Sequence, residues 1–308
     1  PSRGLGDVYK RQLHHKAPHR TWMPDTCDLQ LFSDTTFELP ANFYDDYNGR
    51  QAAHEQKMSI IKDMDLVYDL KMADKENEIH TTTGLENAGR SMYNSMTPEE
   101  KAAWDAHYDP IIQKFKKDKL SGKQLSEWKY QQYMRDYLRV IHSIDRNIGV
   151  LLNYLEKTGL LENTMIVYTS DQGFYMGEHG WFDKRFMYEE SFRTPLIIRY
   201  PAKIKAGSEC TALVQNIDYA PTYLDIAGIE KPDYMVGTSL VPLFGGETPR
   251  DWREYLYYHY YDYPAIHMVR RHDGVRDSRY KLIHFYNDID VWAVSYTHLR
   301  AHETELHL

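Results

Sequence analysis

A long amphipathic segment from about residue 126 to 157 constrains the fold more than any other part of the chain. Its apolar residues recur at steps of three and four, the period of one helix face; they are Tyr133, Tyr137, Val140, Ile141, Ile144, Ile148, Leu151, Leu152 and Leu155. Thr158-Gly159 supplies a glycine stop, and an apolar run at 164–168 follows. A helix that leads into a buried strand across a short loop predicts an α/β fold with a parallel sheet covered by helices.

Chemically active side chains gather where the run 164–168 ends. Asp171 and Gln172 follow it directly, and His179 and Lys184 come soon after. Ligands bind outside the carboxyl ends of strands in open α/β sheets. A carboxylate beside an amide oxygen suits a hard cation, and the following histidine and lysine suit an anion. From the residues alone, a plain turn and a solvated lysine remain alternatives.

The other segments predict shorter elements. In the helix 126–157, the polar residues Asp136, His142 and Asp145 indicate a solvated face. Thr97-Pro98-Glu99-Glu100 predicts a helix start, because it combines an N-cap with proline and acids in the first turn. The remaining predictions are a helix over 52–74, a polar loop over 74–96, a strand over 194–201, a short helix over 221–228, and antiparallel strands over 253–263, 265–271 and 278–286 with a turn at Asp273-Gly274.

Composition excludes several functional classes. The formal net charge of −8 argues against a general nucleic-acid-binding surface, so an anionic substrate would need a local group of cations. Two cysteines, Cys27 and Cys210, define neither a disulfide framework nor a zinc site. No apolar run approaches the length of about 18 residues that spans a membrane. The 26 tyrosines, dense near Tyr255–Tyr263, suit either a sugar-binding surface or half-buried strands.

Both ends of the chain resemble translated sequencing-adapter DNA. The first segment reads PSRGLGDVYKRQ and the last includes VSYTHLRAHET. We therefore expect residues 1–12 and 293–308 to be adapter-derived scars, and the native protein to be cut at both ends. Between them we expect the C-terminal part of a catalytic α/β domain at 13–245 and a truncated antiparallel subdomain at 246–292.

The native sequence opens with a cationic loop. Five of the nine residues in His14–Trp22 can carry positive charge, and Pro18 blocks a helix there. Such a loop suits an anion, although a basic surface loop would have the same composition.

Taken together, several short motifs resemble the C-terminal portion of a type I sulfatase in the alkaline-phosphatase-like superfamily. They stand in the family's order: APH at 17–19, TSDQG at 169–173, GEHG at 177–180, DK at 183–184, TPLIIRYP at 194–201 and DYAPTYLDIAG at 218–228. The resemblance implies a mixed sheet sandwiched by helices and an N-terminally truncated chain. The loop HKAPHRTWMP and the aromatic C-terminal region are most similar to carbohydrate sulfatases, such as those acting on 6-O-sulfated N-acetylglucosamine in glycosaminoglycans or mucins.

The resemblance also implies roles for individual residues. Asp171 and Gln172 match one pair of calcium ligands, Lys184 matches the lysine that grips the sulfate, and His19 matches the histidine that assists the leaving group. Its substrate-contact positions are His179, His267 and Arg271, with a sulfated carbohydrate as the partner. The family is extracytoplasmic, either periplasmic or secreted.

The departure from the family pattern concerns the nucleophile. Type I sulfatases convert the Cys or Ser of a C/S-x-P-x-R motif to formylglycine, and no Cys or Ser here has that context. We therefore expect the intact protein to hydrolyse sulfate esters and this fragment alone to be inactive. The alternatives are a phosphodiesterase or phosphonate monoester hydrolase of the same superfamily, and a degenerate homologue that only binds.

Overall fold

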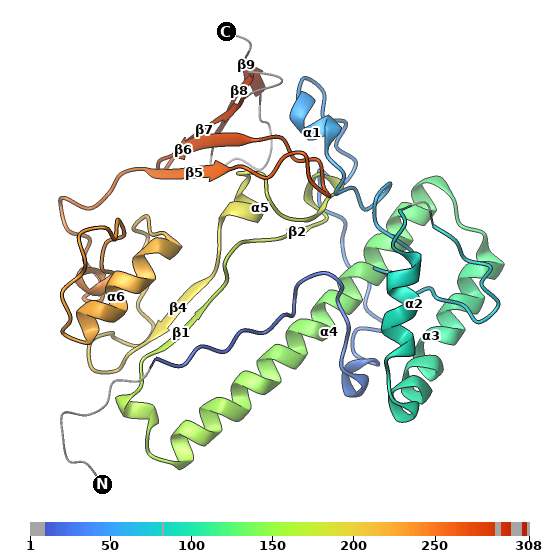
Figure 1. Cartoon of the computed structure of the whole chain (residues 1–308), viewed down its shortest axis with the longest axis horizontal. Coiled ribbons are helices and arrows are strands. Elements are labelled where there is room, and N and C mark those ends of the chain that lie inside the picture. Colours follow the sequence, from blue (N-terminus) through green and yellow to red (C-terminus); the bar gives the residue numbers. More distant parts are fainter. Residues whose placement is uncertain (1–9, 82, 287–290, 297–303, 307–308) are drawn as a thin grey trace.

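The computed structural model describes residues 10–81, 83–286, 291–296 and 304–306 (Figure 1). Its α-helices are α1 (Gln51–Glu55), α2 (Glu86–Asn94), α3 (Pro98–Asp118), α4 (Gly122–Lys157), α5 (Glu189–Phe192) and α6 (Tyr219–Ile226). Its strands are β1 (Ile166–Thr169), β2 (Tyr175–Met176), β3 (Phe182–Asp183), β4 (Leu196–Arg199), β5 (Leu256–Tyr260), β6 (His272–Arg276), β7 (Tyr280–Phe285), β8 (Val291–Tyr296) and β9 (Thr304–Leu306). In the described part, no helix is both long and apolar enough to cross a membrane.

The two long helices confirm the sequence prediction. Helix α4 begins four residues before the predicted start and ends at Lys157, with Gly159 at φ 71° beyond its C-cap. Helix α3 begins with a capping box: Thr97 Oγ1 accepts from the Glu100 amide at 3.2 Å, and Glu100 Oε2 accepts from the Thr97 amide at 2.8 Å. Figure 1 shows α2 and α3 grouped beside α4, away from the C-terminal sheet.

The prediction of a solvated face on α4 is wrong for Asp136. Its carboxylate is 1% exposed and accepts hydrogen bonds from Tyr108 Oη and Arg139 Nη1, each at 2.9 Å. Lys71 Nζ lies 3.2 Å from the other carboxylate oxygen. A buried carboxylate persists only with such partners, whereas His142 and Asp145 are exposed as predicted.

Segment 52–74 does not form the predicted helix. Only α1 is helical there, and the remainder is a series of turns stabilised by aspartate side chains. Asp63 accepts from the Ser59 amide at 2.8 Å, and Asp65 accepts from two amides at 2.7 Å. Aspartate offers the backbone an alternative to helical hydrogen bonds. Of the apolar residues that predicted the helix, Met58, Met64 and Leu70 are buried, whereas Ile61 is 37% exposed. Ile60 and Val67 are buried instead of Ile61 and Leu66.

The predicted loop 74–96 is also wrong in part, because its second half is helix α2. Arg90 on this helix pairs with Glu86 at 3.1 Å and donates to the Asp74 carbonyl at 3.1 Å. The hydrogen bond to Asp74 ties α2 to the segment before it.

The strand pairing differs from the predicted parallel sheet. Strands β1 and β4 lie where they were predicted, yet they pair antiparallel, from Ile166↔Arg199 to Thr169↔Leu196. Every strand pair in the described part of the chain is antiparallel. The two-stranded β1–β4 ribbon leaves Tyr168 at 41% and Ile197 at 64% exposure, so it is not buried on both faces.

The C-terminal sheet has the order β5-β6-β7-β8-β9 and is antiparallel, as predicted for this region. The predicted strand 265–271 is wrong, because the strand is β6 at His272–Arg276. The predicted turn Asp273-Gly274 therefore lies inside a strand. The turn is at Asp277, whose carboxylate accepts from the Arg279 amide at 2.7 Å. Strands β8 and β9 extend the sheet beyond residue 292, and the adapter origin of 293–308 stays a prediction.

Gly274 is required by close packing within this sheet. A Cβ there would lie 2.5 Å from Met187 Sδ and 2.6 Å from the Leu282 carbonyl oxygen. We expect Gly274→Ala to lower the free energy of unfolding by about 1–3 kcal/mol, the usual cost of overpacking. Gly149→Ala in α4 is the matched control, because nothing lies within 4 Å of its added Cβ. Equal urea midpoints for the two variants would contradict this packing.

Two hydrophobic cores meet just before Lys184. Trp181 belongs to a core with Phe186 and Val269, whereas the next residue, Phe182, belongs to a core with Trp22 and Tyr133 of α4. Trp181 and Phe182 are both fully buried. The segment that leads to Lys184 is therefore fixed from both sides.

His272 is a buried histidine whose charge state affects stability. It is 0% exposed, its Nδ1 lies 2.8 Å from the Arg270 carbonyl oxygen, and its ring stacks on Phe186 and Tyr260. Burial lowers the pKa of His272 to about 4. The pKa of an unfolded histidine is about 6.5, so the unfolded state binds this proton more readily at intermediate pH.

The contribution of neutral His272 to stability is complete above about pH 6.5 and is lost as the pH falls toward 4. We expect His272→Phe to remove a slope of up to about 1.4 kcal/mol per pH unit in this window. Urea unfolding at several pH values measures it, with His54→Gln as an exposed-histidine control. An unchanged slope in His272→Phe would exclude this residue as the cause.

Candidate active site

The structure brings the cationic N-terminal loop against the segment before Lys184. The Arg20 guanidinium lies 5.0 Å from the centroid of the Phe182 ring. Trp22 packs edge-on against Phe182 at 6.3 Å and against Phe174 at 6.1 Å. Residues of the cationic loop therefore pack against Phe174 and Phe182, which stand more than 150 positions later in the sequence.

Lys184 is buried beside a carboxylate that gathers several cations. Its Nζ lies 3.4 Å from Asp183 Oδ1 and 5.7 Å from the Phe174 ring centroid. Asp183 also accepts from Arg185 Nη1 at 2.7 Å and pairs with His267 Nε2 at 2.9 Å. Burial opposes ionisation of Asp183, but the His267 hydrogen bond and the nearby Arg185 charge outweigh it and hold its pKa well below the usual value.

His267 lies between two acceptors. Its Nδ1 is 2.8 Å from the Lys57 carbonyl oxygen, and its Nε2 faces Asp183. Both contacts are hydrogen bonds only if both ring nitrogens carry protons. Lys184, Arg185 and Arg20 together carry three positive charges, whereas their partners Asp183 and Asp69 carry two negative charges, and this excess suits an anionic ligand.

The predicted cation ligands stand at the end of β1, where the sequence placed them. Asp171 is exposed and accepts a long hydrogen bond, 3.4 Å, from Ser170 Oγ. The Gln172 carboxamide makes no hydrogen bond to any residue that the structure describes. Gly173 fixes the next turn, since its amide donates to the Ser191 carbonyl at 2.8 Å and a Cβ there would lie 2.1 Å from the Glu190 carbonyl oxygen. The Asp171 carboxylate and the Gln172 carboxamide therefore offer two oxygen donors just beyond the end of β1.

His19 is exposed and its imidazole is oriented by the main chain. Its Nδ1 lies 2.7 Å from the carbonyl oxygen of Arg20, so Nδ1 donates and Nε2 faces away. Arg20 itself is held by Asp69 through two hydrogen bonds of 2.6 Å. Burial lowers the pKa of Arg20, but the Asp69 carboxylate more than compensates and raises it above the ordinary value.

The remaining predicted contact residues have partners of their own. His179 is 3% exposed, with Nδ1 at 2.6 Å from Asp45 Oδ2, and its carbonyl oxygen accepts from Tyr47 Oη at 2.5 Å. Arg271 donates to the carbonyl oxygens of Tyr261 at 2.8 Å and Tyr263 at 2.5 Å. The structure does not bring His179 or Arg271 into contact with the Lys184 cluster through any of these bonds.

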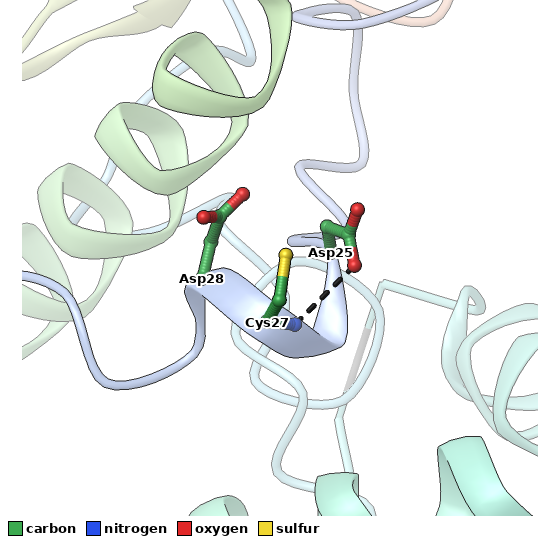
Figure 2. A group of neighbouring side chains, drawn as sticks. All are labelled: Asp25, Cys27 and Asp28. Atoms are coloured by element: carbon green, nitrogen blue, oxygen red, sulfur yellow. Dashed lines mark hydrogen bonds between the residues drawn. The ribbon is translucent and has the colours of Figure 1, made fainter. Parts of the chain in front are cut away.

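A different group of side chains has the spacing of a metal site, at residues 25–28. Figure 2 shows Asp25, Cys27 and Asp28 around a short 3-10 helix, with the Cys27 amide donating to Asp25 Oδ1 at 3.3 Å. Asp28 is already paired with Arg146 at 2.7 Å and accepts a hydrogen bond from Ser143. Desolvation and the neighbouring Asp25 carboxylate raise the pKa of the exposed Cys27 thiol, which disfavours the thiolate that metals bind. The group is therefore satisfied within the protein.

Sequence reasoning missed Arg20, Asp69 and Asp183. The signals were weak: Arg20 adjoins His19, Asp183 adjoins Lys184, and Asp69 lay in a segment read as helix. Only the fold shows that Asp69 reaches a residue 49 positions earlier.

Comparison with known proteins identifies the family. The family model described as Sulfatase matches residues 13–229, and the model described as N-sulphoglucosamine sulphohydrolase, C-terminal, matches residues 177–307. The chain is 56% identical over 282 residues to an N-acetylglucosamine-6-O-sulfatase of Bacteroides thetaiotaomicron, covering 91% of this chain and 50% of that protein. It thus spans about half the length of this relative.

Solved structures support the same assignment. One described as a complex with its substrate D-glucosamine-2-N,6-O-disulfate has a TM-score of 0.86 and 54% identity, covering 91% of this chain and 57% of that one. A phosphonate monoester hydrolase from Silicibacter pomeroyi has a TM-score of 0.51 and 30% identity, covering 55% of this chain and 36% of that one. These neighbours confirm the predicted alkaline-phosphatase-like fold class. With the sulfatase model extending across residues 13–229, this chain belongs to the sulfatase family.

Proposed function

We propose that the polypeptide containing this chain is a carbohydrate sulfatase that removes the 6-O-sulfate from N-acetylglucosamine in a sulfated glycan. The observation that carries the proposal is the cationic cluster around buried Lys184, whose ammonium lies 5.7 Å from the ring of Phe174, two residues after Gln172. The similarity to an N-acetylglucosamine-6-O-sulfatase supports the choice of sugar.

In this proposal Lys184 binds the sulfate oxygens and stabilises the negative charge that develops on them. His19 acts on the departing sugar oxygen through Nε2, because Nδ1–H donates to the Arg20 carbonyl oxygen; Nε2 donates a proton only when the ring is the doubly protonated imidazolium. Arg271 contacts the sugar at the rim. His267 is 4% exposed and faces Asp183, so in this proposal its predicted substrate role is exerted through Asp183. His179 orients the turn 177–180 through its contact with Asp45. The predicted substrate role of His179 is the least supported, because its ring is buried against Asp45.

Asp171 and Gln172 would hold a calcium ion. Both offer hard oxygen atoms, and the described residues place no cation on either of them, so the donor chemistry fits. The ion supplies positive charge to the sulfate when bound. The remaining ligands and the formylglycine nucleophile belong, in this proposal, to parts of the polypeptide outside these 308 residues, because no C/S-x-P-x-R motif occurs here.

A phosphonate monoester hydrolase is the second candidate, favoured by the match to the Silicibacter pomeroyi enzyme. A homologue that only binds is disfavoured because Asp171, Gln172 and Lys184 are all present. Release of inorganic sulfate from N-acetylglucosamine-6-sulfate by the complete polypeptide tests the proposal, with a phosphonate monoester as the competing substrate. Faster turnover of the phosphonate, or no sulfate release at all, would overturn it.

An extracytoplasmic site of action goes with this function, because sulfated glycans are met outside the cytoplasm. Fractionation of cells expressing the complete reading frame tests it. Recovery of the enzyme only with cytoplasmic markers would contradict this location.

A further inference from the structure

We propose that Asp69 is a positioning residue for the reaction, acting through Arg20 to orient His19. The inference rests on the proposed function, since His19 has a role only if the site cleaves an ester. It goes beyond that function by giving a role in the reaction to a residue of the irregular segment 56–74, which precedes the strand end at Asp171 by about 100 positions in sequence.

The contact between Arg20 and Asp69 is a two-point clamp. Arg20 Nε and Nη2 donate to the two carboxylate oxygens of Asp69, each at 2.6 Å. The Asp69 side chain is 0% exposed and that of Arg20 is 10% exposed. Such a paired geometry fixes the plane of the guanidinium as well as its position. The rings of Tyr68 and Phe182 flank the guanidinium at 5.4 and 5.0 Å and restrict it further.

Asp69 is itself held by the fold. Its Oδ2 accepts from the Asp65 amide at 2.8 Å, and its carbonyl oxygen accepts from Lys71 Nζ at 2.6 Å. Lys71 pairs with Asp136 of α4 at 3.2 Å. The clamp is therefore anchored on the longest helix of the molecule.

Because Arg20 is fixed in this way, its main-chain carbonyl also has a fixed position, and this carbonyl orients His19. The carbonyl oxygen of Arg20 accepts from His19 Nδ1 at 2.7 Å, which sets the direction in which Nε2 points. On its other side the guanidinium lies over Phe182, two residues before Lys184. Asp69 and Arg20 thus set the separation between the group that donates the proton and the group that binds the sulfate.

The competing explanation is that Asp69 only stabilises the fold, since loss of one partner of a buried ion pair is destabilising in any protein. The two explanations differ when His19 is absent. If Asp69 acts through His19, removing Asp69 costs activity only while His19 is present. If it acts on stability alone, the cost is the same in both backgrounds.

The experiment is a double-mutant cycle of Asp69→Asn and His19→Ala in the complete polypeptide, measured on N-acetylglucosamine-6-sulfate. We expect Asp69→Asn alone to lower kcat by about 10- to 100-fold, as for a misplaced catalytic group, with KM near its wild-type value. In the His19→Ala background the same change should have little further effect. Asp74→Asn is the matched control, because Asp74 is likewise a buried carboxylate in an ion pair, with Lys116 at 2.9 Å, and caps the Glu78 amide without touching Asp69 or Arg20.

Hydrogen–deuterium exchange of residues 17–22 gives a readout that does not depend on activity. Asp69→Asn should speed exchange in this loop, and Asp74→Asn should not. If wild-type protein releases no sulfate, the proposed function fails while this exchange measurement still decides the inference. An equal loss of kcat in both His19 backgrounds, or unchanged exchange in Asp69→Asn, would overturn it.

Discussion

Replacement of Lys184 by alanine in the complete polypeptide is expected to lower kcat for sulfate release by about 10²- to 10³-fold, the usual effect of removing one donor to a developing oxyanion. Lys184 is 8% exposed, and its ammonium lies 3.4 Å from Asp183 at the centre of the cationic cluster. Loss of this charge leaves Arg185 and His267 bound to Asp183, so no neighbour can replace it directly.

Two further variants interpret that result. Lys184→Arg keeps the charge but changes the shape of the donor, so it should restore only part of the activity. Lys203→Ala removes an exposed lysine from a surface turn and should leave kcat unchanged. Stopped-assay sulfate release with each purified variant measures all three. A Lys184→Ala enzyme with wild-type kcat would remove this residue from the mechanism.

Removal of calcium is the second large effect. Chelation of divalent ions should abolish sulfate release, and added calcium should restore it. Calcium at about 100 times its dissociation constant should stabilise the protein by about 2.7 kcal/mol, which raises the melting temperature by a few degrees. We expect Asp171→Ala to lose this thermal shift, because it removes a carboxylate ligand from the strand end.

Asp25→Asn is the control for the calcium effect. Asp25 belongs to the acidic group of Figure 2 and pairs with Arg146 at 2.7 Å. Its replacement should leave the calcium-dependent melting shift intact. If the calcium-dependent melting shift were lost in Asp25→Asn but kept in Asp171→Ala, calcium would bind at Asp25 and not at Asp171, which would contradict the proposed site.

The helices with strong local signals could be predicted from the sequence. Helix α4 repeats its apolar residues over ten turns, and α3 carries a capping box at Thr97 and Glu100. Segment 52–74 shows how a similar apolar pattern can mislead. Its aspartates cap backbone amides locally, so the chain forms turns instead of a helix. The turns bury Ile60 and leave Ile61 of the helical pattern exposed.

Pairing between distant strands was harder to predict. The apolar runs at β1 and β4 indicated strands, but not that the two would pair antiparallel. At the C-terminal sheet, Asp273-Gly274 had the composition of a turn. Gly274 instead lies inside β6, where Met187 and Leu282 leave no room for a side chain. This is a tertiary constraint that the local sequence does not contain.

The candidate site divides in the same way. Asp171, Gln172 and Lys184 could be proposed from the sequence because each stands in a short motif near a strand end. Asp69 could not be found, since its significance depends on an ion pair with Arg20 across 49 positions. His179 and Arg271 stood in or near motifs, yet their side chains bond to Asp45 and to the 261–263 backbone respectively.

The central claim is that the strand end at Asp171-Gln172 and the cluster at Lys184 bind opposite sides of one sulfate ester. A crystal structure of the complete polypeptide, with its nucleophile replaced and N-acetylglucosamine-6-sulfate bound, measures this directly. We predict a sulfate oxygen within about 3 Å of Lys184 Nζ and a calcium ion within about 2.3–2.6 Å of Asp171 and Gln172 oxygens. A sugar bound with its sulfate directed away from Lys184, or a metal held by other residues, would contradict the account.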